Sequence, residues 1–151
     1  MLAFDLYRHW ETDVRPFTVT ALRRLSPEQL HWRPDGGRSA WDLALEAVQT
    51  EWRWIYRDAL QKVDSSARFD SAEFESLDAL LLFWQRVHRA TLEWLQDSPV
   101  TELARKYRMP DVGAPLATMN WILFNVLTQE ARMQGELFSL MRQQGLTPPK
   151  I

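Results

Sequence analysis

The spacing of apolar residues along residues 117–144 is the feature that most constrains the fold of this chain. Within this segment they recur at steps of three and four, a period that places them on one face of an α-helix. Gly145 and the pair Pro148-Pro149 come next, and this punctuation is typical of a helix C-terminus. The predicted inward stripe consists of Ile122, Val126, Gln129, Met133, Leu137 and Leu140.

The N-terminal half predicts two helices joined by a turn-rich connector. The first is expected over residues 4–24, with a kink or break at Pro16, which lacks the N–H that a regular helix needs. Ser26 begins a helix-start signal for one short turn, after which proline and glycine mark a connector. The second helix is expected over residues 39–62, because Ser39 opens a capping box.

The C-terminal half predicts two more helices separated by a long loop. A third helix is expected over residues 72–96, where an apolar stripe again has helical spacing. Residues 97–116 contain three prolines and a glycine, so we predict a loop that serves as a lid or pocket rim. With the last helix, these segments predict an all-α fold, an up-down four-helix bundle that occupies residues 1–151 as a single domain.

Composition excludes several classes of protein. The chain has 151 residues and no cysteine, which excludes disulfides, thiolate ligands and thiol nucleophiles. Its net charge is −2 with both signs interspersed, so no basic stripe favours nucleic-acid binding. No apolar run approaches the ~20 residues of a membrane span, and the N-terminus carries charges where a signal peptide would be apolar. We expect a cytoplasmic protein that binds neither nucleic acid nor membrane.

Three motifs, taken in their order and spacing, resemble the DinB-like four-helix-bundle superfamily. They are residues 25–34 after the first helix, residues 39–46 at the start of the second, and residues 140–149 at the end of the last. The resemblance spans about residues 5–149 and implies the bundle fold. It also implies a metal-binding face, which in this family combines a histidine of the second helix with a His-x-x-x-His of the fourth. Residues four apart lie on one helical face, so two imidazoles can reach one divalent ion.

The resemblance places Glu46, Gln129 and Met133 at the three histidine positions. A carboxylate can still bind a metal, but an amide oxygen is a weak ligand for zinc or nickel and a thioether suits copper(I). We therefore predict that the metal site is lost and that no cofactor is needed, while weak binding of zinc or nickel stays open. On this interpretation Met133 fills the core, and Gln129 is a polar remnant that bonds to Glu46. A small-molecule pocket retained without metal is the alternative.

His88 lies on the predicted buried stripe of the third helix, close to Trp84. A single histidine in such a stripe is more often a hydrogen-bonded core residue than a base or ligand. We expect its partner to be Glu46 or Gln129, which would make His88 the best remaining proton-transfer group. Glu130 joins His88 and Trp84 as a candidate pocket residue, although its position beside the metal face predicts a sideways or outward orientation.

Two functions follow, and neither identifies a substrate. The first is a catalytically silent or small-molecule-binding bundle without metal, which we favour over an enzyme. The second is implied by the resemblance: a metal-dependent S-transferase that uses a bacillithiol-type or mycothiol-type thiol, or an isomerase-like enzyme. In such an enzyme the metal would lower the pKa of the thiol, and without metal His88 is the plausible replacement.

The distribution of aromatic residues predicts a homodimer. The second helix carries apolar residues on two sides, whereas a bundle core needs one broad stripe per helix. Trp54, Trp94 and Phe138 lie off the predicted interior stripes, so aromatic surface should remain for a two-fold contact. Alternatively, these side chains line the pocket or lie under residues 97–116.

Overall fold

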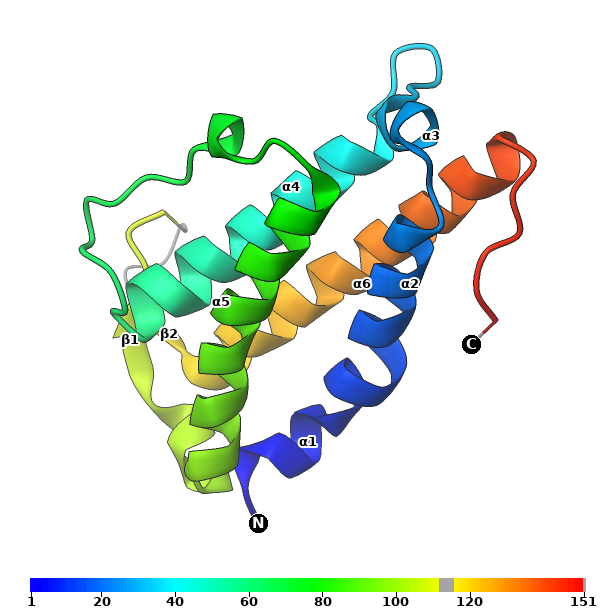
Figure 1. Ribbon diagram of the computed structural model, residues 1–151. Coiled ribbons are helices and arrows are strands. Elements are labelled where there is room, and N and C mark those ends of the chain that lie inside the picture. The colour runs from blue at the N-terminus through cyan, green and yellow to red at the C-terminus, as the bar shows by residue number, and fades with distance from the viewer. Residues whose placement is uncertain (112–115, 151) are drawn as a thin grey trace.

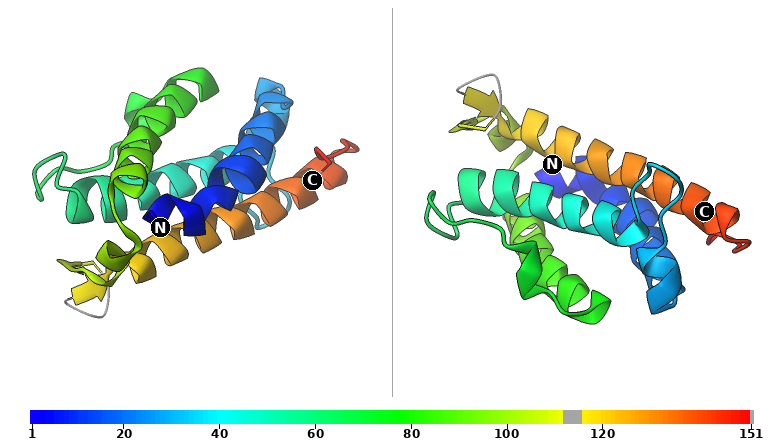
Figure 2. Two further views of the ribbon diagram at one scale, coloured as in Figure 1. Left: turned by 90° about the horizontal axis from the view of Figure 1, so that it is seen from below. Right: turned by 90° about the horizontal axis from the view of Figure 1, so that it is seen from above.

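The computed structural model describes residues 1–111 and 116–150. Across these residues, four long helical segments pack together (Figure 1), which confirms the predicted helical architecture. Figure 2 shows α4 and α6 in one layer, with α5 and the first segment on the same side of it. The segments are α1 (Ala3–His9) continued by a π-helical turn (Trp10–Val14) and α2 (Arg15–Arg23); α4 (Ala40–Glu51) continued by a π-helix (Trp52–Ala59); α5 (Leu77–Asp97); and α6 (Met119–Gln143).

The first helical segment is interrupted where a break was predicted. Pro16 lies in the first turn of α2, and the π-helical turn Trp10–Val14 comes immediately before it. There the Arg15 N–H donates to the carbonyl of Trp10, five residues back instead of four. This turn leaves both Trp10 and Arg15 buried in the interior of the bundle. The proline therefore helps to place a charged residue inside.

The capping residues set the boundaries of the next elements. Ser26 caps the short helix α3 (Pro27–His31) and Ser39 caps α4, both through capping boxes. The sequence predicted a helix start at Ser26 and a capping box at Ser39. The second helical segment ends near Leu60, slightly earlier than predicted, because Gln61 adopts a positive φ of 53°.

The third helical segment begins later than predicted. Ser76 caps α5 by accepting a hydrogen bond from the N–H of Ala79, and the preceding residues form a short 3₁₀ turn (Ser71–Glu73). Thr118 caps α6, and Gly145 with a φ of 77° follows its last turn, as the sequence predicts. No helix within the described residues combines the length and apolar character that a membrane crossing requires.

The segment predicted as a long loop contains regular structure that the sequence analysis missed. A 3₁₀ turn (Val100–Ala104) is followed by β1 (Lys106–Arg108), which pairs antiparallel with β2 (Leu116–Thr118). Part of the prediction, at residues 112–115, lies outside the described residues. Arg108 and Pro110 of this segment line a cavity together with residues of 57–65, which agrees with a pocket rim. The described residues of the segment do not line the cavity between the first helical segment and α5, so they give no support to a lid over that one.

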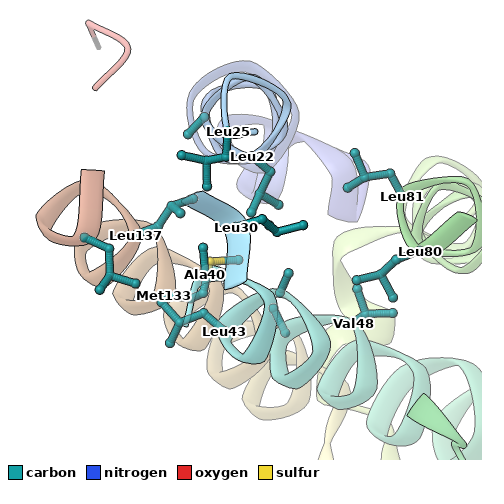
Figure 3. Close-up of a cluster of buried hydrophobic side chains, with 14 of the residues drawn as sticks. Leu22, Leu25, Leu30, Ala40, Leu43, Val48, Leu80, Leu81, Met133 and Leu137 are labelled. Atoms are coloured by element: carbon teal, nitrogen blue, oxygen red, sulfur yellow. The ribbon is translucent and has the colours of Figure 1, made fainter. Parts of the chain in front are cut away.

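The buried apolar residues form two clusters, one toward each end of the bundle. The first joins α2, α4, α5 and α6, and Figure 3 shows Leu43, Leu80 and Leu137 among its members. The second joins α1, the end of the π-helix after α4 and the start of α6, through residues such as Trp10 and Ile55. Charged residues lie between the two clusters on each long helix, and they form the site described below.

We expect Met133→Ala to lower the free energy of unfolding by about 2–5 kcal/mol, because Met133 is buried in the first cluster. Chemical denaturation followed by circular dichroism measures this change. Leu82→Ala is the matched control, since Leu82 is exposed on α5, and its effect should stay within about 0.5 kcal/mol. Equal effects of the two substitutions would contradict the core position of Met133.

Candidate functional site

A cavity of about 340 Å³ lies between the first helical segment and α5. This volume falls at the lower end of the range of roughly 300–1,000 Å³ that is typical of ligand pockets. Its lining combines three environments. The apolar residues are Val19, Leu81 and Leu92; the buried or half-buried polar and aromatic ones are Glu11, Arg15, Trp84 and His88; and the exposed ones are Arg23, Gln85 and Arg89.

Arg15 is the centre of a buried network of charges next to this cavity. It is 9% exposed and donates to Glu130 Oε1 from Nε at 2.8 Å and from Nη2 at 2.6 Å. The same Nη2 donates to Glu51 Oε1 at 2.7 Å. Trp10 donates to the other oxygen of Glu130 at 3.2 Å, and the Arg15 guanidinium carbon lies 3.8 Å from the centroid of the Trp84 ring. These hydrogen bonds and the face of the Trp84 ring thus offset the free-energy cost of burying the charge of Arg15.

Glu51 accepts hydrogen bonds from four different side chains although it is 1% exposed. Besides Arg15, its donors are Trp84 Nε1 at 2.9 Å, Thr91 Oγ1 at 2.9 Å and His88 Nδ1 at 2.7 Å. Burial raises the pKa of Glu51, but the charges of His88 and Arg15 and their hydrogen bonds outweigh it and lower the pKa overall. Glu51 is therefore an ionised carboxylate in the interior of the bundle.

His88 lies between two carboxylates. Its Nδ1 faces Glu51, and its Nε2 contacts Glu11, which is half-buried in the cavity. Burial and the charge of Arg15 lower the pKa of His88, yet the two carboxylates outweigh both effects and raise it. The hydrogen bond to His88 lowers the pKa of Glu11. Because only the protonated ring can donate from both nitrogens, we assign His88 as an imidazolium.

The protonation state of the network determines its chemistry. Arg15 and His88 carry two positive charges against the three carboxylates of Glu11, Glu51 and Glu130. An imidazolium donates hydrogen bonds and protons, and it becomes a base only after it loses a proton. Glu11, Arg15 and His88 all line the cavity, and Glu11 is the most exposed of the three, so a ligand would contact the network through these residues.

The three metal-ligand positions of the resemblance converge in a separate cavity of about 190 Å³ between α4 and α6. Gln129 Nε2 donates to Glu46 Oε1 at 3.2 Å, which confirms the predicted bond between them. Met133 is buried and lines the same cavity. The Arg38 guanidinium contacts Glu46 and donates to Glu136 at 3.0 Å.

The donor set of this second cavity does not fit a divalent transition metal. It offers one carboxylate, one amide and one thioether at the family positions, with an arginine beside them. Zinc prefers thiolate, imidazole or carboxylate ligands in a tetrahedral arrangement. Within the described part of the chain, no group of three histidine, cysteine or acidic side chains is arranged to hold a metal ion.

Two predictions about site residues are wrong. His88 is paired with Glu51 and Glu11, not with Glu46 or Gln129. Its helix faces the first helical segment across the cavity, whereas the metal-ligand positions lie between α4 and α6. Glu130 does not face outward: it is 2% exposed and bonded to Arg15. The α6 face that meets Trp10 and Arg15 is a second buried face beside the predicted stripe.

Of the three candidate pocket residues, Trp84 and His88 line the cavity, whereas Glu130 does not line it and is bonded to Arg15, which does. The sequence analysis missed Glu11, Arg15 and Glu51. A signal existed for Glu51, which follows Val48 by three residues and precedes Ile55 by four, within the buried stripe. A charged residue in such a stripe indicates a buried partner.

The fold and the site define a class of protein: a four-helix bundle with a polar layer between its helices and a cavity that opens beside that layer. The DinB family model matches residues 1–151, and the chain belongs to this family. Its structure is similar to that of a DinB-like protein from Bacillus cereus ATCC 10987, with a TM-score of 0.67, 18% sequence identity, and coverage of 90% of this chain and 89% of that one. This similarity concerns the fold. Comparison with curated proteins gives no match.

We expect Arg15→Met to lower the free energy of unfolding by about 3–5 kcal/mol, because it leaves Glu51 and Glu130 buried without their main counter-charge. Equilibrium denaturation at neutral pH measures the effect. Arg23→Met is the matched control, because Arg23 is exposed on the same helix, and it should change stability by less than about 0.5 kcal/mol. If Arg15→Met lowered the free energy of unfolding only slightly, the prediction would be wrong, and water would replace the arginine at little cost in free energy.

Proposed function

We propose that this DinB-family protein binds a small organic molecule in the cavity between the first helical segment and α5, without a resident metal. The observation that carries this proposal is the Glu11–His88 pair at the cavity, beside apolar walls. Pockets that bind small molecules commonly combine apolar walls with a few oriented polar groups. The buried bonds from His88 and Arg15 to Glu51 fix the positions of those groups before a ligand arrives.

The charges around the cavity favour a ligand with an apolar body and an anionic group. Arg23 and Arg89 are exposed lining residues, and neither belongs to an ion pair formed within the described residues. A guanidinium is well suited to bind a carboxylate through two hydrogen bonds. Val19, Leu81 and Leu92 would contact the apolar part. We therefore infer an amphipathic carboxylate as the ligand class.

A thiol-transfer or isomerase-like activity is the second candidate. Its support is the imidazolium of His88 at the cavity, since a nearby cation lowers the pKa of a thiol and favours the thiolate. The same imidazolium already contacts Glu11 and Glu51, which reduces the charge available to a thiolate. We therefore favour ligand binding over catalysis.

Binding of octanoate and of an aromatic carboxylate, each compared with its methyl ester, tests the proposed ligand class. We expect the acids to quench tryptophan fluorescence saturably, because Trp84 lines the cavity, and to bind more tightly than the esters. Arg89→Gln should weaken the binding of the acids about tenfold, because it removes one charge-assisted hydrogen bond. Arg86→Gln is the control on α5, since Arg86 is exposed and does not line the cavity. Acids and esters that bind equally, or not at all, would contradict the proposal.

We further propose that the protein forms a homodimer, through an apolar surface composed of Leu6, Trp121 and Phe124. These side chains are 49%, 42% and 60% exposed, and Trp121 stacks on Trp54 with ring centroids 5.6 Å apart. Exposed apolar clusters of this kind favour self-association. The sequence predicted that Trp54, Trp94 and Phe138 would leave aromatic surface for this contact, and for Phe138 that prediction is wrong. Phe138 is buried in the core, while Trp54 and Trp94 are half-buried.

Light scattering coupled to size exclusion tests the dimer. We expect a mass about twice the 17.8 kDa of one chain. Phe124→Glu should return the protein to one chain's mass, because it places a charge in the proposed contact. Leu82→Glu is the control at an exposed leucine of α5, and it should leave the dimer intact. A monomer mass at tens of micromolar wild-type protein would rule the dimer out.

A further inference from the structure

The cavity between α4 and α6 contains a cation that belongs to the chain itself. Arg38 lies immediately before Ser39, the cap of α4, and its side chain reaches across to α6. One guanidinium nitrogen contacts Glu46 of α4, and the other donates to Glu136 of α6 at 3.0 Å. The guanidinium therefore bridges two carboxylates from the two helices that carry the family's metal-ligand positions.

The surrounding groups explain why a cation is needed there. Glu46 and Glu136 line the same small cavity, and two like charges that face one space repel each other. Gln129 bonds to one oxygen of Glu46 and Arg38 contacts the other, so the carboxylate is shared between amide and guanidinium. The remaining amide oxygen of Gln129 is buried and has no hydrogen-bond partner among the described residues. The polar lining thus combines the oxygens of Glu46, Gln129 and Glu136 with the guanidinium groups of Arg38 and Arg132.

We infer that the guanidinium of Arg38 takes the place of the divalent cation at the family's metal-binding positions and keeps metal ions out. An arginine stays protonated at every accessible pH, so its charge is permanent. Because the arginine is part of the chain, its effective concentration at the cavity is much higher than the concentration of a dissolved metal ion. A metal would have to displace it and would then find few suitable ligands. This inference concerns a different cavity from the proposed ligand pocket and does not depend on it.

The inference predicts a latent metal site in the variant that lacks this charge. Arg38→Met would leave the carboxylates of Glu46 and Glu136 and the amide oxygen of Gln129 lining one cavity without the cation that contacts both carboxylates, and Arg132 would be the remaining cation in the lining. Oxygen-only ligand sets suit manganese, calcium or magnesium instead of zinc or nickel. The variant should therefore gain affinity for a hard divalent ion that wild-type protein does not bind.

Manganese binding to the full, untagged chain, followed by electron paramagnetic resonance of the free ion, tests this gain. We expect no saturable binding by wild-type protein and a dissociation constant on the order of 10⁻³ M for Arg38→Met. Arg132→Met is the matched control, because Arg132 lines the same cavity but belongs to no ion pair within the described residues. Adding Glu136→Gln to Arg38→Met should abolish the gain in manganese affinity, because it removes one of the two carboxylates. Circular dichroism confirms that each variant is folded.

A second comparison restores the family's histidines with and without Arg38. Glu46→His, Gln129→His and Met133→His together should bind nickel only weakly while Arg38 is present. Adding Arg38→Met should tighten nickel binding at least about tenfold, because the competing charge is gone. Equal affinity with and without Arg38, for manganese in the first series and nickel in the second, would overturn the inference. So would a folded four-substitution variant that binds no nickel, since the positions would then not meet at one ion.

Discussion

The ion pairs of Arg15 with Glu51 and Glu130 are the interaction on which the arrangement of the bundle depends. They connect α2 to α4 and α6, and the bond from His88 to Glu51 adds α5. Burying such charges costs free energy, which the network offsets because each carboxylate accepts from several donors. An apolar cluster packs on each side of this layer. The layer therefore fixes which residues of the helices face one another.

The buried polar layer around Arg15 also links the fold to the cavity. A π-helical segment, Trp10–Val14, runs up to Arg15, and another, Trp52–Ala59, starts directly after Glu51. Segments with this wider turn often occur at functional sites, because they rotate side chains away from regular helical positions. Here they accompany a buried guanidinium and a buried carboxylate. A rigid polar layer beside an open cavity gives the proposed ligand a prearranged surface to contact.

Arginine supplies a permanent positive charge in two different cavities of this protein. Arg15 neutralises Glu51 and Glu130 in the interior, and Arg38 contacts Glu46 and Glu136 between α4 and α6. The first pairing is buried, so loss of its arginine should destabilise the fold strongly, whereas the second is half-exposed and its loss should cost little. The importance proposed for Arg38 lies in which ions the cavity admits. This DinB-family chain thus keeps its helix packing with Glu46, Gln129 and Met133 at the positions where the resemblance implies histidines.

Local sequence signals determined the helices, since capping at Ser39, the break at Pro16 and the apolar period along α6 depend on residues a few positions apart. The contact between Glu46 and Gln129 was also predictable, because the family resemblance supplied the pairing. Only the tertiary structure decided the polar layer. Arg15 and Glu130 are 115 residues apart in sequence, and periodicity places a side chain on a face without naming its partner. Which charged groups meet depends on how the helices are rotated and packed, and that is a property of the whole bundle.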